Sequence, residues 1–375
     1  MQQDQFILPP RVVIRDPQGT QFVIERVLGK GALGAVYLVR ERAQADKLFA
    51  LKEVIHPNAG ERASFVFEGQ VLTRLHHKAL PRVHRVFEND KLMRMYVLMD
   101  YIKGEDLEAL RNRQPEQCFP LTLVLSLLHP IANALIYLHT QEPPIVHRDI
   151  KPANIIIPDG GGEAMLVDFG SAKEYRADAV TSIVAHRSPG YAAPEQYRTG
   201  TTPATDIYGL AATVYALLTG VAPIDAPSRI ARSWSEGADP LRPANLLKPD
   251  IPEGVADVLA RGLSVQIADR WQTVEEFWQA LLTSSPQHTT SAPWMGLAHP
   301  FPGEAQAEDG DMPALSKEQS APLLNKRAVV RLFTVLVALA AIGLGVFSWL
   351  SGLTILLFCC VGLVLLWLGL LFSLR

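Results

Sequence analysis

The sequence contains only three cysteines, which excludes a disulfide framework. Cys118 stands alone in the first 325 residues, whereas Cys359 and Cys360 lie in an apolar segment near the end. No pair of cysteines has the spacing of a zinc site, so the sequence argues against zinc as well. The lack of structural cysteines suits a reducing compartment.

A basic excess is also missing. Lys and Arg number 35 and Asp and Glu number 38, which gives a formal net charge of −3. Because nucleic-acid-binding proteins usually carry a strong basic excess, we expect no nucleic-acid partner. The first ten residues lack the basic and apolar regions of a secretory signal, so we do not expect a cleaved signal.

Charged residues make up only 19% of the chain, and one long segment has none. No charged residue occurs from Leu332 to Leu374. At about 1.5 Å per residue, this run would form a helix of about 65 Å, about twice the hydrocarbon thickness of a bilayer. A single span is therefore a poor fit, and Ser351-Gly352 divides the run near its middle.

This division predicts a helical hairpin in the lipid bilayer, with transmembrane helices at 328–350 and 353–374. Basic residues flank both ends of the hairpin, namely Lys326, Arg327, Arg331 and Arg375. Basic flanks favour the cytoplasmic side, so we expect both ends there. A single tilted anchor, with its remainder at the membrane interface, is the alternative.

The remaining chain reads as a strand-rich part followed by a helix-rich part. Strand-like runs lie at 22–40, where a glycine-rich stretch joins two of them, and at 48–54, 82–87 and 93–99. Helical patterns lie at 65–75, 121–138, 207–218 and 274–282. Residues 284–327 are rich in Ser, Thr, Pro and Gly, which predicts a flexible linker. The fold class is therefore α+β with two lobes.

Gly29, Gly31 and Gly34, followed by Val36, have the form G-x-G-x-x-G-x-V. Glycines allow a hairpin to approach phosphates closely, with backbone N–H groups facing the anion. A dinucleotide site would need a helix opening at the third glycine, whereas residues 35–39 are strand-like. A plain hairpin turn remains an alternative for this motif alone.

Lys52 lies inside an apolar strand, where its charge is costly unless it meets a fixed anion. Glu68 falls on the following predicted helix, where it could pair with Lys52. The alternative is an edge lysine that points to solvent.

The strongest signal is the run from His147 to Asn154. Asp149 could accept a proton from a hydroxyl nucleophile, Lys151 could neutralise a phosphoryl group, and Asn154 could bind Mg²⁺. Asp168-Phe169-Gly170 follows behind a second apolar run. This spacing predicts a β-hairpin that brings Asp168 next to Asn154 at one metal site.

Together these motifs resemble the eukaryotic-type protein kinase superfamily, and most of all bacterial membrane-anchored serine/threonine kinases. The expected elements occur in order and continue with Ala193-Pro194-Glu195, Asp206 and Arg270. The resemblance implies a kinase domain at 20–283, with an N-terminal lobe to about residue 100 and an N-terminal extension at 1–19. It also implies a cytoplasmic kinase domain, since the enzyme needs ATP.

The resemblance implies a role for each matching residue. Asp149, Lys151, Asn154, Asp168, Lys52 and Glu68 would be catalytic, with Asn154 and Asp168 binding Mg²⁺, or Mn²⁺ as the alternative. The residues that would bind ATP are Gly29, Lys30, Gly31, Gly34, Val36, Ala50, Lys52, Met99, Asp100, Ile102 and Asp106. Arg270 would pair with Glu195, and Asp206 would brace the catalytic loop from below.

The resemblance also bears on substrate and regulation. Lys151 implies transfer to protein Ser or Thr hydroxyls, and Ser188 would bond Asp149 and Lys151, although Arg187 departs from the usual glycine. Thr181 and Ser182 are candidate phosphorylation sites that Arg148 could bind, or else solvated hydroxyls. A homodimer is left open.

Two other functions compete with an active protein kinase. A pseudokinase would keep the fold as an ATP-binding scaffold without transferring phosphate, but Lys52, Asp149 and Asp168 are all present. A small-molecule kinase would share the Asp and metal-binding residues, but it would generally lack the Ala193-Pro194-Glu195 element.

Overall fold

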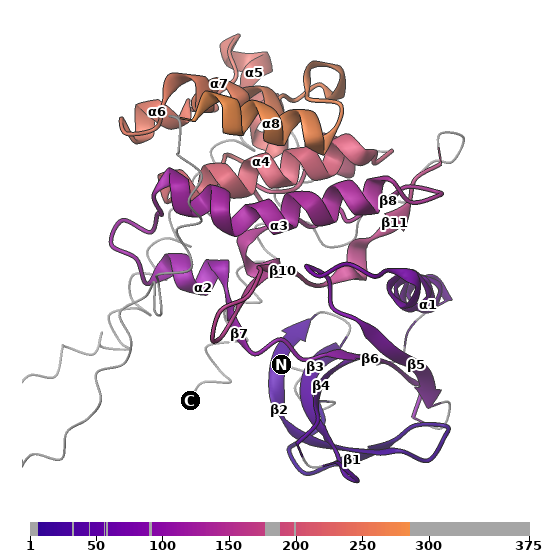
Figure 1. The fold of residues 1–375 in the computed structure, drawn as a ribbon. Helices are drawn as coiled ribbons and strands as arrows, with labels where there is room; N and C mark the ends of the chain where they lie inside the picture. The colour runs from indigo at the N-terminus through magenta and orange to yellow at the C-terminus, as the bar shows by residue number, and fades with distance from the viewer. Residues whose placement is uncertain are drawn as a thin grey trace, which may run out of the picture. The chain divides into compact units, whose positions relative to one another are not determined.

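The computed structural model describes residues 7–285 apart from 32–33, 45, 56, 58, 90–91, 177–187 and 199, and without the side chains of 59, 64 and 68. Within this range the chain forms two lobes, one built on a β-sheet and one on helices (Figure 1). The α+β, two-lobed prediction is confirmed. The predicted linker beyond residue 285 and both predicted transmembrane helices lie outside the described residues.

The N-terminal lobe is an antiparallel sheet of six strands in the order β1-β2-β3-β4-β6-β5. The strands are β1 (Val13–Arg15), β2 (Gln21–Gly31), β3 (Gly34–Glu41), β4 (Leu48–Ile55), β5 (Val83–Asn89) and β6 (Arg94–Asp100). One helix, α1 (Ala59–Arg74), joins β4 to β5 and packs on the sheet. The predicted strands are confirmed, and so is the helix predicted at 65–75, which begins earlier, at Ala59.

Side chains alternate between the two faces of the sheet along each strand. Both faces carry buried apolar residues. In β4, Phe49 and Leu51 belong to an apolar cluster on one face, whereas Val54 belongs to the main core that includes α1. Burying an aliphatic or aromatic side chain stabilises a fold by about 1.5–3 kcal/mol. A shift of strand register would therefore disrupt apolar packing on both faces of the sheet.

β1 was not predicted from the sequence. It has only three residues, and only the central Ile14 is buried, so it offers almost no alternating pattern. Its place is set by distant contacts, because the buried Asp16 after β1 forms an ion pair with Arg85 of β5, at the opposite edge of the sheet. The sheet thus curls until its two edge strands are linked (Figure 1).

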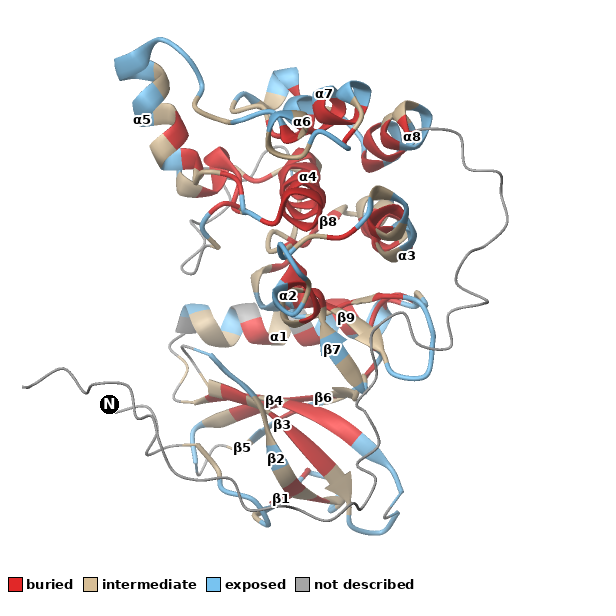
Figure 2. Cartoon of the chain, turned by 90° about the vertical axis from the view of Figure 1, so that its left-hand side faces the viewer, coloured by how far each residue is buried: buried red, intermediate tan, exposed pale blue. Residues whose placement is uncertain are grey.

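The C-terminal lobe is built around two long helices, α3 (Leu121–His139) and α4 (Pro203–Thr219), which pack against each other. α4 is buried along nearly its whole length (Figure 2). The other helices are α2 (Leu107–Asn112), α5 (Ala226–Glu236), α6 (Ala244–Leu247), α7 (Glu253–Gly262) and α8 (Val274–Ser284). The helices predicted at 121–138, 207–218 and 274–282 are confirmed.

In the part of the chain that the structure describes, α3 is the one helix long and apolar enough to cross a membrane. Half of its apolar stretch is buried, and Leu128, Ile131 and Leu135 lie fully inside the core. α3 is therefore the core helix of this lobe.

The remaining elements are short. They are the strands β7 (Gly104–Asp106), β8 (Ile145–Val146), β9 (Ile155–Pro158), β10 (Met165–Leu166) and β11 (Lys173–Glu174) and the 3-10 helices η2 (Pro152–Asn154), η3 (Phe169–Ser171), η4 (Pro194–Tyr197) and η5 (Ile267–Asp269). β9 and β10 form the predicted hairpin, with Leu166 opposite Ile155.

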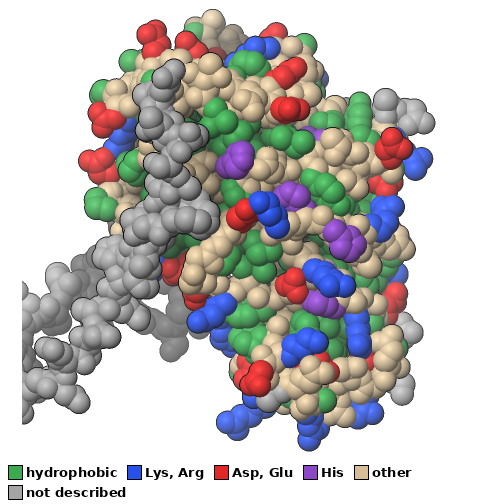
Figure 3. All heavy atoms as spheres, viewed as in Figure 1, with side chains coloured by type: hydrophobic (Ala, Val, Ile, Leu, Met, Phe, Trp, Pro, Cys, Tyr) green, Lys and Arg blue, Asp and Glu red, His purple; other side chains and the backbone are tan. Residues whose placement is uncertain are grey.

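On the face shown in Figure 3, Lys and Arg side chains are scattered among acidic and apolar ones. Such mixing is ordinary for a soluble domain surface.

Candidate active site

The glycine-rich stretch is a hairpin between β2 and β3, as predicted, with Gly31 opposite Gly34. A Cβ at Gly34 would lie 2.0 Å from the Glu53 carbonyl oxygen of β4, so only glycine fits there. A Cβ at Gly29 would meet nothing within 4 Å, which leaves its backbone open to approach. Close strand packing explains the third glycine, and the open space at the first leaves room for a phosphate.

Lys52 of β4 reaches across to the other lobe. Its Nζ lies 2.9 Å from Oδ1 of Asp168, and its side chain is only 17% exposed. The Lys52 ammonium holds the pKa of the Asp168 carboxyl well below its usual range. Asp168 therefore stays ionised at neutral pH. Glu68 lies on α1 as predicted, but its side chain is outside the described part, so its pairing with Lys52 stays a prediction.

Asp149 is held on several sides. Its Oδ2 accepts hydrogen bonds from Lys151 Nζ at 2.8 Å and from Asn154 Nδ2 at 2.9 Å. Its Oδ1 accepts one from Ser188 Oγ at 2.8 Å, and Lys151 Nζ also donates to that Oγ at 2.8 Å. The structure thus brings Asp149, Lys151, Asn154 and Ser188 together. The prediction that Ser188 bonds both Asp149 and Lys151 is confirmed.

The backbone before Asp149 is fixed from below by Asp206, the buried residue near the start of α4. Its carboxylate accepts hydrogen bonds from the backbone N–H groups of His147 at 2.8 Å and Arg148 at 2.7 Å. Arg148 has a φ of +68°, in the left-handed region that costs a non-glycine residue energy. These two hydrogen bonds offset the strain, and the predicted bracing role of Asp206 is confirmed.

Asn154 lies directly before β9 and Asp168 lies two residues after β10, at the same end of the hairpin. The N–H of Val167 donates to the Asn154 carbonyl at 2.9 Å, which places Asp168 beside Asn154. The Asn154 side chain donates two hydrogen bonds from Nδ2, to the carbonyl and to Oδ2 of Asp149. Its amide oxygen and the Asp168 carboxylate form an all-oxygen donor set.

An all-oxygen donor set fits Mg²⁺, which typically takes one or two protein carboxylates together with substrate phosphates. Among the described residues no group of three or more His, Cys, Asp and Glu side chains could hold a metal by itself. These residues fit a metal that arrives together with a nucleotide.

The predicted ATP-binding residues from Met99 to Asp106 lie at the end of β6 and after it. Ala50 lies opposite Met99, and Val36 lies opposite Lys52, so these residues neighbour one another on the sheet. Lys30 is exposed near the end of β2, and Ile102 lies between β6 and β7.

Two residues of that predicted set have their side chains engaged elsewhere. The Asp100 carboxylate lies 2.7 Å from His84 Nε2 and accepts from the Arg82 N–H at 3.1 Å. Asp106 caps α2 by accepting from the Ala109 N–H at 2.8 Å. Their carboxylates hold β5 and α2 in place in this structure.

Sequence reasoning missed three residues that support the site. His139 Nε2 lies 2.8 Å from Asp206 Oδ2, Gln196 Nε2 donates to the Arg148 carbonyl at 2.8 Å, and Thr205 Oγ1 donates to Glu195 Oε1 at 2.8 Å. No local sequence pattern indicates these three residues, because the partner of each lies far away in the sequence or depends on a turn.

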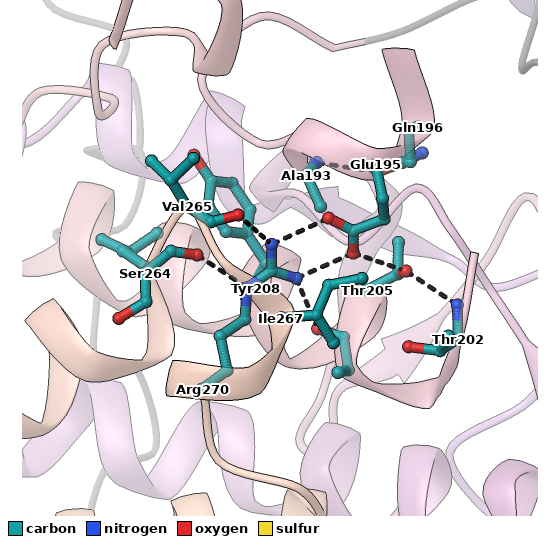
Figure 4. Close-up of polar contacts among 12 residues, drawn as sticks. Ala193, Glu195, Gln196, Thr202, Thr205, Tyr208, Ser264, Val265, Ile267 and Arg270 are labelled. Atoms are coloured by element: carbon teal, nitrogen blue, oxygen red, sulfur yellow. Dashed lines mark hydrogen bonds and ion pairs between the residues drawn. The ribbon is translucent and has the colours of Figure 1, made fainter. Parts of the chain in front are cut away.

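The predicted pair of Arg270 with Glu195 is confirmed, with two contacts of 2.7 and 2.8 Å (Figure 4).

Comparison with known proteins agrees with this geometry. The model of the protein kinase domain family matches residues 22–293. The chain is 33% identical over 276 residues to the serine/threonine-protein kinase PkaA of Streptomyces coelicolor, covering 68% of this chain and 48% of that protein. It is 34% identical over 272 residues to the serine/threonine-protein kinase PknF of Mycobacterium tuberculosis, covering 69% of this chain and 55% of that protein.

The chain thus spans about half the length of these curated relatives. Among solved structures, the kinase domain of PknI from Mycobacterium tuberculosis matches with a TM-score of 0.57 and 28% identity. That match covers 74% of this chain and 100% of the PknI chain.

Proposed function

Because the chain belongs to the protein kinase family, we propose that it is a serine/threonine protein kinase that transfers the γ-phosphoryl group of ATP to protein hydroxyls. The observation that carries this proposal is the Asp149 carboxylate, which Lys151, Asn154 and Ser188 hold in one orientation. Phosphoryl transfer depends on positioning and charge stabilisation more than on covalent chemistry by the protein, and a fixed carboxylate supplies the positioning.

In this proposal Asp149 accepts the hydrogen of the attacking hydroxyl and orients it. Lys151, which already contacts Asp149 and Ser188, neutralises charge on the phosphoryl group as it moves. Asn154 and Asp168 hold Mg²⁺, with Mn²⁺ as the alternative, and Lys52 takes the α- and β-phosphates. When bound, Mg²⁺ neutralises the developing charge on the phosphate oxygens.

The proposed substrate class follows from the contacts of Lys151. The relatives named above are serine/threonine-protein kinases, and Lys151 lies two residues after Asp149, where the family's serine/threonine enzymes have it. Ser188 contacts both Lys151 and Asp149, so this lysine is held beside the carboxylate that would orient the hydroxyl.

The test uses the full chain, labelled ATP and a generic basic protein. Asp149→Asn and Lys52→Met should each lose at least 99% of phosphoryl transfer, because electrostatic positioning supplies most of the rate. Asp250→Asn, the same chemical change at an exposed residue, is the matched control and should transfer normally. Wild-type protein that binds ATP without transferring phosphate would instead indicate a pseudokinase.

Regulation by phosphorylation is a second part of the proposal. The predicted acceptors Thr181 and Ser182 lie outside the described residues. Arg148 supports the idea, since its Nη1 is buried and has no hydrogen-bond partner among the described residues. Burial lowers the pKa of Arg148 to about 10, so the guanidinium stays charged at neutral pH, and a phosphate would compensate this buried charge. Mass spectrometry of active protein should find one of the two modified; full activity with both unmodified would contradict this.

We also propose that the chain is anchored in the cell membrane by the hairpin of helices 328–350 and 353–374, with the kinase domain cytoplasmic. The uncharged run from Leu332 to Leu374 and its basic flanks support this. A kinase domain also needs ATP from the cytoplasm, which requires the same orientation in the membrane.

A further inference from the structure

Helix α1 contacts the sheet through a glycine. A Cβ at the buried Gly69 would lie 2.4 Å from Cγ2, 3.1 Å from Cγ1 and 3.3 Å from Cβ of Val86 in β5. Ordinary van der Waals contact begins at about 3.4 Å, so the helix backbone here lies closer to the strand than any side chain allows. Val86 is β-branched and has little rotamer freedom to move aside.

Val86 belongs to a row of residues that crosses the sheet. Val86 lies opposite Val97, Val97 opposite Lys52, and Lys52 opposite Val36. Directly opposed residues in a sheet share one face, so Val86 and Lys52 both face the α1 side. Two strand spacings, about 9.6 Å, separate them. A side chain at position 69 would therefore hold α1 further from the row that carries Lys52.

Apolar packing and ion pairs also hold α1, since Phe65, Val71 and Leu72 are buried in the main core. Arg62, two turns before Gly69, forms an ion pair with Glu88 of β5. Arg74 at the helix end lies 3.2 Å from Glu174, and the His76 N–H donates to Tyr137 of α3 at 3.0 Å. The long side chains of these ion pairs can stretch, whereas the contact at Gly69 involves the backbone itself.

We propose that Gly69 is a positioning residue for phosphoryl transfer. Its lack of a side chain seats α1 at the height at which Glu68, the preceding residue, can reach Lys52. The inference rests on the proposed kinase function. It adds that the geometry of the Lys52 site requires the absence of a side chain at position 69, where α1 crosses β5.

The test compares variants of the full chain by steady-state kinetics at varied ATP concentration. Gly69→Ala should lower kcat/KM for ATP about 10- to 100-fold, because a misplacement of about 1 Å can cost that much. Val86→Ala, at a residue 37% exposed and outside the site, should stay within about 2-fold of wild type. The double variant should recover most of the loss, since its shortest remaining contact is 3.3 Å.

Gly254→Ala, the same change in helix α7, is the matched control and should leave the kinetics unchanged. Alanine favours a helix over glycine by about 0.5–1 kcal/mol, so helix propensity alone predicts no loss from Gly69→Ala. If Gly69→Ala does not fold, Val86→Leu replaces it, and this added bulk under Gly69 should also lower kcat/KM.

Equal activity of Gly69→Ala and wild type would overturn the inference, as would a double variant no better than the single one. An inactive wild type would instead overturn the proposed function, so the two failures are distinct.

Discussion

The Asp149 carboxylate is oriented by both nearby and distant residues of the chain. Its two carboxylate oxygens accept hydrogen bonds from Lys151 and Asn154, which follow it closely, and from Ser188, which lies 39 positions further on. The nearby donors come with the local turn of η2, whereas the distant one depends on how the chain returns to the site. Asp149 is therefore oriented only when both parts of the chain are in place.

His147 gives a prediction for pH. Burial lowers the pKa of this fully buried imidazole below the ordinary value of about 6.5, against an opposing effect of Asp206 and Asp149. Between the folded pKa and about 6.5, the unfolded chain binds more protons than the folded one. The free energy of unfolding should therefore decrease as pH falls below about 6.5.

Urea unfolding of wild type and His147→Phe at pH 7.5 and 5.5 tests this point. Wild type should lose more stability between the two pH values than the variant, which lacks the titrating group. Equal losses would show that His147 does not titrate as argued. The comparison holds even if the variant is less stable throughout, because only the difference between the two pH values counts.

At the scale of elements, one buried ion pair joins η4 to the chain after η5. The Arg270 guanidinium contacts Glu195 through two nitrogens and donates to the carbonyls of Ser264, Ala204 and Val265 (Figure 4). Because the donors and acceptors are satisfied, the cost of burying both charges is largely offset.

Removing one partner should leave an uncompensated buried charge. We expect Glu195→Ala to lower the free energy of unfolding by about 3–5 kcal/mol. Asp159→Ala, which breaks an exposed ion pair with Lys103, is the control and should cost no more than about 1 kcal/mol. A small effect of Glu195→Ala in urea unfolding would mean that water or another group replaces the carboxylate.

The closure of the N-terminal sheet leads to a second prediction at this scale. Asp16 is buried, accepts from the Thr20 N–H at 2.8 Å and pairs with the partly exposed Arg85 across the two edge strands. Asp16→Asn should lower stability by about 1–2 kcal/mol, because a hydrogen bond to a charged group is lost. Hydrogen exchange should then increase first in β1; unchanged protection of β1 would show that the pair does not hold the edge.

At the scale of the whole molecule, the proposed membrane hairpin can be tested by its topology. A reporter active only in the cytoplasm should work when fused after Arg375. A reporter active only outside should work when inserted between Ser351 and Gly352, because the loop between the two helices lies outside. Activity of the outer-face reporter after Arg375 would contradict the hairpin and indicate a single crossing.

Local order in the amino-acid sequence indicates the chemistry of the site and most of the helices and strands. Asp149, Lys151 and Asn154 fall within one turn, and the hairpin spacing to Asp168 is local, so residue order alone indicates their proximity. Strand and helix periodicity likewise depends on near neighbours. For the same reason the short strand β1, with one buried residue, left no signal.

The distant residues that support this chemistry are brought to it only by folding. The contacts of Asp206 with His147 and Arg148, of Asp16 with Arg85, and of Gly69 with Val86 join segments that no periodicity relates. Each such contact closes a long loop of chain, which costs conformational entropy. Close packing of the folded interior offsets this cost, and that packing does not exist in the unfolded chain. A glycine in a helix reads as a weak point in the sequence, and only the neighbouring strand explains why it is there.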